Sequence, residues 1–366
     1  MKLVALLVLT SCAVLSAFVP AARQGPPYDT VPAVRGAPLY DAAAQDNTAG
    51  VFVSRDVYLM GTRARLSTYA VTHDSGLATL ESALAVLEDA EEELSTWRAS
   101  SEMSALNRQP VGEPWMVDAR LCRMFSDVWE WHHATDGAFD PSIGRLLAAW
   151  DVRGEGIIPS REAHERARAL SGMSLLAFDP GRCALTRRAD VSLDEGAFGK
   201  GEALDRAAAV LGDGPWMIDL GGQISVGGRV PPEGAWPIGI ADPRRRDHPA
   251  LQVRMATGSL STSAGSERDL VVNGERVGHI FDPRTGRPAT FNGSVTVWHE
   301  RGLAADALST ALYVMGPEAG LRWARRQGIA ACYLIPERGT LRVETTRAFR
   351  GLVTASSRGL KPPRYR

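Results

Sequence analysis

The chain has 366 residues, of which 45% are apolar and 23% charged, and its formal net charge is −1. This composition is that of a globular protein with room for one large domain or two small ones. A net charge so close to zero argues against a nucleic-acid partner, because it implies no basic face. The longest basic run, residues 244–246, is interpreted as a solvated loop.

The first 22 residues are typical of a targeting segment and are not expected to join the fold. Residues 3–9 form a short apolar core, and the stretch that ends at Cys12 resembles a bacterial lipobox, in which the cysteine is lipidated. Ordinary cleavage near Ala17 or Ala22 is the alternative. The apolar stretch is too short for a membrane span. We therefore expect export to the periplasmic side of the inner membrane, with a lipid anchor at Cys12.

Three regions follow this segment. Residues 23–50 are rich in Pro, Ala, Gly and Asp and predict a flexible tether. We expect the folded domain over residues 51–347 and a basic C-terminal tail over 348–366.

Besides Cys12, the chain has cysteines at positions 122, 183 and 332, whose wide spacing predicts neither a disulfide framework nor a zinc site. We expect these three to be packing residues.

The predicted elements mix strands and helices without a regular alternation. Two strands are expected within 51–70, around a turn at Met60-Gly61-Thr62. In chain order, helices are predicted over 76–94, 119–135, 161–170, 202–211, 303–315 and 317–327, and strands near 175–178, 183–186, 216–220, 236–240, 251–255, 270–272, 277–281, 294–298 and 331–335. This mixture predicts an α+β fold.

One acidic side chain interrupts the apolar helical stretch at 303–316. Asp306 and Thr310 are four residues apart, so they share one face of a helix. A carboxylate among apolar neighbours is costly to bury unless something pairs with it. A hard cation such as Mg²⁺ or Ca²⁺ would accept both oxygen ligands. The alternative is an amphipathic helix whose Asp and Thr bond a neighbouring loop.

A second polar pattern lies just upstream, at 273–288. Asn273-Gly274 predicts a hairpin turn, and residues 277–281 predict a strand that ends in an Asp-Pro-Arg-Thr-Gly turn. His279 and Phe281 would then share one strand face. A histidine in this position is either a satisfied polar residue or a functional imidazole.

Lysine is rare in this chain and occurs only at positions 2, 200 and 361. Lys200 is therefore the only lysine within the expected domain, and it lies in a Gly-Lys-Gly segment that opens a predicted helix. A helix N-terminus and a compact ammonium group both attract phosphate. Chance survival of one lysine is the alternative.

Taken in order, these motifs resemble the FAD:protein FMN transferase family, the ApbE-type flavin transferases, over about residues 57–335. The matching segments are Met60-Gly61-Thr62, 94–97 with 101–107, 137–144, 193–201, 219–222, Thr262-Ser263, 279–286 and 305–310. The sequence departs from the family pattern at three positions, with Ala264 after Thr262-Ser263, Phe198 before Gly199-Lys200, and Glu195 where a small residue is common.

The resemblance implies a single T-fold-related catalytic domain that transfers FMN from FAD to a threonine or serine hydroxyl and releases AMP. The acceptors would be exported redox-protein subunits. Mg²⁺ would be held by Asp306, Thr310 and the backbone carbonyl of Ala197. We take His279 as the candidate base for the acceptor hydroxyl, because imidazole titrates near neutrality.

The resemblance also implies a set of FAD-binding residues, namely Met60, Trp97, Ala138, Phe139, Asp140, Asp194, Lys200 and Ile280. Trp97 could stack on the isoalloxazine or the adenine ring, or it could be a core or rim aromatic residue. Asp140 precedes Pro141 and could bond the cofactor or only make the turn. Two other activities stay open, a Mg²⁺-dependent FAD pyrophosphatase and a flavin-binding lipoprotein without catalysis.

Overall fold

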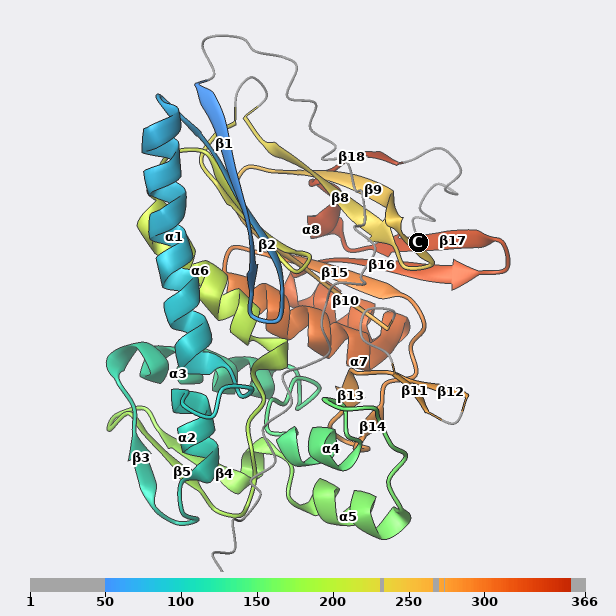
Figure 1. Ribbon diagram of the computed structural model, residues 1–366. Coiled ribbons are helices and arrows are strands. Elements are labelled where there is room, and N and C mark those ends of the chain that lie inside the picture. The colour runs from blue at the N-terminus through green and yellow to red at the C-terminus, as the bar shows by residue number, and fades with distance from the viewer. Residues whose placement is uncertain (1–49, 231–233, 266–269, 273, 357–366) are drawn as a thin grey trace, which may run out of the picture. The chain divides into compact units, whose positions relative to one another are not determined.

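The structure is a computed structural model that describes residues 50–230, 234–265, 270–272 and 274–356. The predicted targeting segment with Cys12 lies outside these residues, as does nearly all of the predicted tether. Within the described part, an antiparallel sheet of eight strands organises the fold (Figure 1). In spatial order its strands are β1 (Val51–Leu59), β2 (Thr62–Ala70), β6 (Trp216–Leu220), β7 (Gln223–Gly227), β10 (Gly258–Ala264), β15 (Ser294–His299), β16 (Ala330–Glu337) and β17 (Thr340–Thr345).

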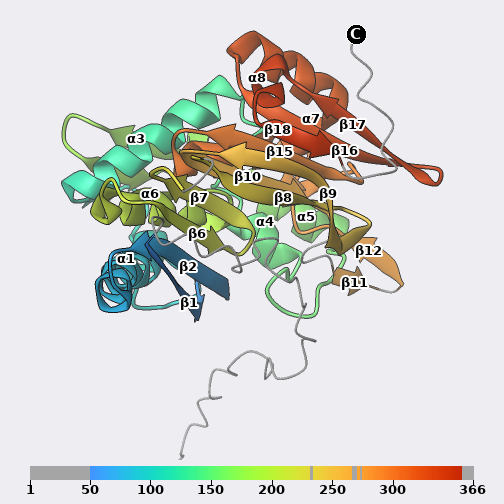
Figure 2. The same ribbon diagram turned by 90° about the horizontal axis from the view of Figure 1, so that it is seen from above.

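The two faces of this sheet are covered differently. Three helices, α1 (His73–Leu94), α6 (Gly199–Leu211) and α7 (Gly302–Gln327), pack on one face (Figures 1 and 2). The opposite face packs against a small sheet of β8 (Trp236–Asp242), β9 (Arg245–Met255) and β18 (Val353–Ser356). Alternation along the strands produces both cores: on β16, for example, Ala331 and Tyr333 pack with α7, whereas Cys332 and Leu334 pack with the small sheet.

A further core forms beside the N-terminal half of α7. It joins α7 to α2 (Glu102–Arg108), α3 (Ala119–Ala134) and the sheet β3 (Pro114–Met116), β5 (Ala184–Arg187) and β4 (Leu176–Asp179). The short helices α4 (Gly144–Ala149) and α5 (Arg161–Ala169) follow one another, near the hairpins β11 (Leu270–Val272) with β12 (Glu275–Val277) and β13 (Phe281–Asp282) with β14 (Arg287–Pro288) (Figure 1). Helix α7 changes direction at Gly316, whose φ is 73°, just before Pro317. None of the helices in the described residues is long and apolar enough to cross a membrane.

The α+β fold is confirmed, and so are the helices predicted at 76–94, 119–135, 161–170, 202–211 and on both sides of Gly316. The predicted strand at 277–281 is wrong. Val277 ends β12, residues 278–280 bend, and β13 begins at Phe281, which packs against Trp150. Helices α2 and α4 and strands β7, β10 and β17 were not among the predicted elements. The chain beyond residue 347 continues through α8 (Arg347–Arg350) into β18, which pairs with β9.

Two of the cysteines correct a second expectation. Cys122, in the first turn of α3, and Cys183, in the turn between β4 and β5, form a disulfide with Cα atoms 5.2 Å apart. They are 61 residues apart in sequence, and only the packing of α3 on the β4–β5 hairpin brings them together. Cys332 is a buried free thiol, as expected, and burial raises its pKa.

Candidate functional site

Asp306 is the centre of the candidate site. It lies near the start of α7, and only 4% of its surface is exposed. Its Oδ2 accepts from the Gly201 amide at 3.2 Å and lies 3.5 Å from Lys200 Nζ, and its Oδ1 is 3.4 Å from Ser261 Oγ. Charge-assisted hydrogen bonds are usually 2.7–2.9 Å long. Asp306 is therefore a buried carboxylate whose contacts are all long.

Two glycines explain how α6 reaches this carboxylate. A Cβ atom on Gly201 would lie 2.3 Å from the carbonyl oxygen of Gly302, and one on Gly302 would lie 2.5 Å from that of Gly201. The helix backbones therefore touch at this crossing, which no side chain would permit. Because α6 approaches α7 so closely, the amide of Gly201 can reach Asp306. Lys200 is carried to the same carboxylate by the first turn of α6.

Serine hydroxyls from β10 line the other side of Asp306. Ser263 Oγ is 2.8 Å and Ser261 Oγ 3.2 Å from Ser309 Oγ, which donates to the Asp306 carbonyl at 3.0 Å. Sequence reasoning missed Ser261 because β10 was not predicted. The alternation of serines at 259, 261 and 263 was the available signal, since alternate strand residues share one face.

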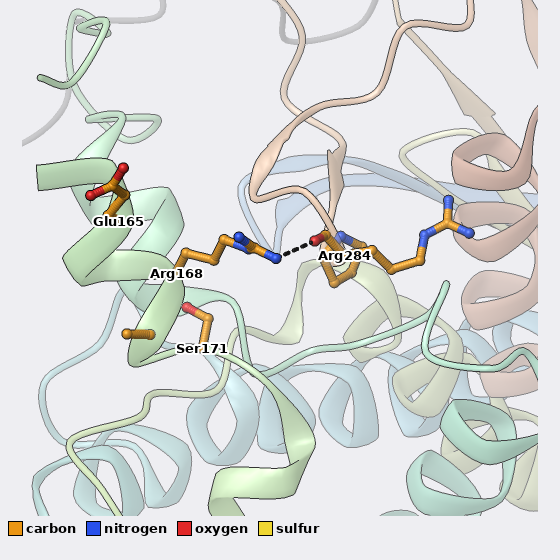
Figure 3. A pocket seen from close by; sticks show the side chains of 6 residues that line it. Glu165, Arg168, Ser171 and Arg284 are labelled. Carbon is orange, nitrogen blue, oxygen red and sulfur yellow. Dashed lines mark hydrogen bonds between the residues drawn. The ribbon is translucent and has the colours of Figure 1, made fainter. Parts of the chain in front are cut away.

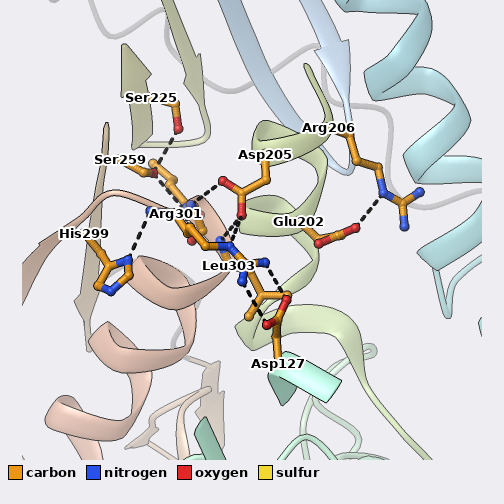
Figure 4. A network of polar contacts seen from close by, with 11 residues as sticks. Asp127, Glu202, Asp205, Arg206, Ser225, Ser259, His299, Arg301 and Leu303 are labelled. Atoms are coloured by element: carbon orange, nitrogen blue, oxygen red, sulfur yellow. Dashed lines mark hydrogen bonds and ion pairs between the residues drawn. The ribbon is translucent and has the colours of Figure 1, made fainter. Parts of the chain in front are cut away.

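A polar network fixes the start of α7 against α6 and the sheet (Figure 4). Asp205 on α6 accepts from the amides of Gly302 and Leu303, which caps α7. Gln223 Nε2 donates to the Gly302 carbonyl at 2.9 Å, and Arg301 Nη1 donates to Asp127 at 2.8 Å. Burial raises the pKa of the Asp205 carboxyl. This network holds Asp306 at a fixed distance from the N-terminus of α6.

The residues around Asp306 fit a magnesium ion better than a zinc ion. The described residues contain no group of three His, Cys, Asp or Glu side chains that could hold a metal. Mg²⁺ needs fewer protein ligands, because it keeps waters and accepts phosphate oxygens. Asp306 offers a carboxylate, Thr310 a half-buried hydroxyl one turn later, and Ala197 packs against the core cluster that includes Ala307 of α7.

Trp97 and Asp194 are joined by a residue that the sequence did not indicate. Trp97 follows α1 and is 64% exposed, and the guanidinium of Arg153 lies 4.4 Å from the centre of its ring. Asp194 accepts from the Gly196 amide at 2.9 Å and from Arg153 Nη2 at 2.6 Å. Glu195, next to Asp194, is buried, and burial together with the Asp194 charge raises the pKa of its carboxyl.

The predicted residues at 138–140 lie in the protein interior. Ala138 and Phe139 pack in the core cluster beside α7, where they are 1% and 0% exposed. Asp140 accepts from the amide of Ser142 at 2.9 Å through Oδ1 and from that of Met173 at 3.1 Å through Oδ2. One carboxylate oxygen of Asp140 therefore holds its own turn and the other holds the segment that begins at Met173, which favours a structural role over a bond to the cofactor.

The remaining predicted residues come from two turns. Met60 sits at φ 49° between β1 and β2, and its methyl group would be 3.8 Å from a Cβ on Gly199, so it covers the start of α6. Ile280 packs against the cluster that contains Leu308 and Leu312 of α7. His279 precedes Ile280 and is half-buried.

A surface hollow lies elsewhere in the structure (Figure 3). It measures about 420 Å³ and is lined by Glu165, Arg168, Ala169, Ser171, Pro283 and Arg284. Arg168 Nη2 donates to the Arg284 carbonyl across it at 3.1 Å. It contains none of the predicted site residues, and we assign it no part in the chemistry.

The chain is an α+β domain built on an eight-stranded antiparallel sheet, in which the buried carboxylate of Asp306 faces the N-terminus of α6. The model of the ApbE family matches residues 60–333, and the chain therefore belongs to the ApbE family. This confirms the resemblance drawn from the motifs.

Named relatives agree with this assignment. The chain is 31% identical over 310 residues to the FAD:protein FMN transferase of Treponema pallidum, covering 78% of this chain and 85% of that one. It is 29% identical over 259 residues to the FAD:protein FMN transferase of Vibrio cholerae, covering 68% and 77%. Among solved structures, the ApbE protein from Thermotoga maritima superposes with a TM-score of 0.77 at 28% identity, covering 83% of this chain and 100% of that one. The flavinyl transferase ApbE from Pseudomonas stutzeri superposes with a TM-score of 0.73 at 29% identity, covering 84% and 98%.

Proposed function

We propose that this chain is an enzyme that transfers FMN from FAD to a threonine or serine hydroxyl of an acceptor protein, using Mg²⁺ and releasing AMP. The supporting observation is the position of Asp306 opposite Lys200 and the N-terminus of α6. The named relatives support the same activity. Phosphoryl transfer needs charge neutralisation and positioning more than covalent help from the protein, and this site offers both.

The start of α6 is the proposed place for the pyrophosphate of FAD. Phe198 at the N-cap makes no side-chain cap, and the Gly201 amide already donates to Asp306, so the amides of Gly199 and Lys200 are the ones proposed for the ligand. Lys200 adds a positive charge, and its side chain is 26% exposed. Asp306, Thr310 and the carbonyl of Ala197 would hold Mg²⁺, which when bound neutralises phosphate charge.

The reaction then needs a nucleophile and a place for its proton. The acceptor hydroxyl oxygen bonds to the phosphorus of the FMN half, while the bond from this phosphorus to the bridging oxygen breaks and AMP leaves. His279 accepts the hydroxyl proton. The carbonyl oxygen of Ile280 accepts from the Ala289 amide at 2.8 Å, which ties the chain directly after His279 to the residue that follows β14.

We further propose that the protein is exported and anchored by lipid at Cys12, and that its acceptors are exported redox subunits. Ordinary signal cleavage near Ala17 or Ala22 remains the alternative. The Cys122–Cys183 disulfide supports export, because disulfides persist mainly in oxidising compartments.

The test combines the purified protein, FAD, Mg²⁺ and a candidate acceptor, and measures the intact mass of the acceptor. We expect an FMN phosphoester adduct together with free AMP. Free FMN and AMP without an adduct would replace this proposal with the pyrophosphatase, and intact FAD would replace it with a non-catalytic flavin-binding protein. An acceptor whose target hydroxyl is changed to Ala serves as the control.

A further inference from the structure

Arg153 is held by three residues that belong to two segments of the site. Its Nη1 donates to the carbonyl of Thr96 at 2.9 Å, its Nη2 to Asp194 at 2.6 Å, and its guanidinium covers one face of Trp97 at 4.4 Å. The Nη2 atom also donates to the hydroxyl of Thr96, which in turn donates to Glu195. One side chain thus links the loop after α1 with the loop before α6.

The loop that presents Arg153 is itself closed and anchored. Trp150, at the end of α4, is 6% exposed and accepts from the Ile157 amide at 2.9 Å. Between these two residues, the backbone carbonyl of Asp151 accepts from the amides of Gly154 and Gly156. Gly154 leaves room for the Asp151 side chain, because a Cβ on it would lie 2.4 Å from the Asp151 carboxylate. The hydrogen bonds within this loop therefore fix the backbone around Arg153.

The same loop contacts the segment of the proposed base. Val152 packs against the cluster of Trp150, Val277 and Phe281, and Phe281 is two residues from His279. Arg153 extends from the next position toward Asp194. The loop thus lies between the His279 segment and the start of the 194–198 segment, which contains Ala197 and leads into α6.

Trp97 has one ring face covered by Arg153 and one face open. One face of the ring is covered by the guanidinium, and 64% of the residue is still exposed. A flat ligand ring can therefore stack on the face that Arg153 leaves open. Arginine stacks well on aromatic rings, and its fixed fork can hold a carboxylate in the same plane. Arg153 fixes the orientation of Trp97 by these means.

We infer that Arg153 is a positioning residue for FAD, which holds Trp97 and Asp194 in a single arrangement so that an aromatic ring of FAD stacks on the open face of Trp97. This inference rests on the proposed function only for the identity of the ligand. It predicts that Arg153 sets the affinity for FAD and leaves turnover largely unchanged, because Asp306 and Lys200 do not contact it.

The test compares Arg153→Gln, Arg153→Lys and Arg98→Gln in the full chain. Arg98 is the matched control, since it neighbours Trp97 in sequence but pairs with Glu91 and Glu92 at the surface. FAD binding is measured by quenching of flavin fluorescence, and FMN transfer gives KM and kcat. Thermal melting shows whether each variant is folded.

We expect Arg153→Gln to raise the Kd and the KM for FAD by about tenfold with kcat changed less than about threefold. Arg153→Lys should recover part of this loss, because it keeps the charge but not the planar stack. Arg98→Gln should match the wild type. In a Trp97→Leu background, Arg153→Gln should have a smaller effect, since the two residues act together.

An unchanged Kd for folded Arg153→Gln would overturn the inference, and so would an equal loss in Arg98→Gln. A fall in kcat at constant KM would overturn it as well. The binding measurement is independent of transfer. If the wild type binds FAD but transfers no FMN, the proposed function fails while the role of Arg153 in binding is still decided.

Discussion

Helix α6 carries two buried ionic groups, and they are paired very differently. Toward α1, Arg206 donates to Glu202 at 2.7 Å and to Glu93, and all three side chains are about nine-tenths buried (Figure 4 shows Arg206 and Glu202). Toward α7, the one cation that pairs with buried Asp306 in the described part of the chain is Lys200, at 3.5 Å. In the first group, one arginine is in close contact with two glutamates. In the second group, the carboxylate of Asp306 has only long contacts.

The difference shows which of two buried charge groups is open to a ligand. Buried charges are normally tightly paired, because an unpaired charge in the interior is costly. Arg206 meets this requirement with its own neighbours, so it stabilises the packing of α6 on α1. Within the described residues, the charge of Asp306 is only partly compensated, because its contacts are long. Such a carboxylate can still bind a cation. Four changes test this comparison.

Removing the loosely held carboxylate should have the largest effect. Asp306→Ala is expected to lower Mg²⁺-dependent turnover at least about a thousandfold, because several kcal/mol of charge stabilisation are lost with the metal. The protein should stay folded, since the contacts of Asp306 are long. Turnover and thermal melting in EDTA measure this. A variant that melts far lower without metal yet keeps its activity would make Asp306 structural.

Removing Arg206 from its contacts with Glu93 and Glu202 should lower the stability of the protein and not its turnover. Arg206→Ala leaves two buried carboxylates without their cation and is expected to lower the free energy of unfolding by about 3–5 kcal/mol. Urea unfolding measures this, and kcat at low temperature should change little. Arg166→Ala is the control, because its 2.6 Å pair with Glu162 is exposed and contributes little. A large loss of kcat in Arg206→Ala with an unchanged free energy of unfolding would show that Arg206 serves the reaction and not the packing of α6.

Lys200→Arg changes the shape of the one cation near Asp306 and keeps its charge. We expect at least a tenfold loss in turnover with FAD binding less affected, because a displacement of about 1 Å can cost on the order of a hundredfold in rate. The guanidinium is bulkier and planar, and α6 cannot move closer to α7 to place it, because the two backbones already touch at Gly201 and Gly302. Kinetics close to those of the wild type would remove Lys200 from the site.

Asp219 tests the smallest effect, that of a half-buried carboxylate that accepts from a backbone amide. Its Oδ1 accepts from Gly222 at 2.8 Å, and burial raises the pKa of its carboxyl. The folded state therefore holds the proton more tightly than the unfolded state, and stability falls as the pH rises from the ordinary aspartate pKa through the raised one. Asp219→Asn keeps an acceptor for Gly222 and should be more stable than the wild type at neutral pH.

Below the ordinary aspartate pKa, the two proteins should unfold alike, since the wild-type carboxyl is then neutral in both states. Thermal melting from acid to neutral pH measures the difference. A gap that is as wide in acid as at neutral pH would show that the substitution acts through packing and not through the charge.

Local patterns in the sequence were enough for several parts of this protein. The spacing of Asp306 and Thr310 predicted a shared helix face, because helical periodicity is a property of neighbouring residues. The glycines around Lys200 marked the start of α6, and the order of the motifs indicated the ApbE family. The same reasoning failed at 277–281, where packing of Phe281 on Trp150 replaced the predicted strand with a bend.

By itself, then, the sequence determined the family, the α+β class and most of the helices, which depend on short-range periodicity and turn chemistry. Only the tertiary structure decided which distant side chains meet. Cys122 pairs with Cys183 across 61 residues, Ser261 reaches Asp306 across 45, and Arg153 holds Asp194 across 41. These contacts depend on the packing of α3, the register of β10 and the closure of one loop, and no local pattern encodes them, because each needs two separate segments to be folded first.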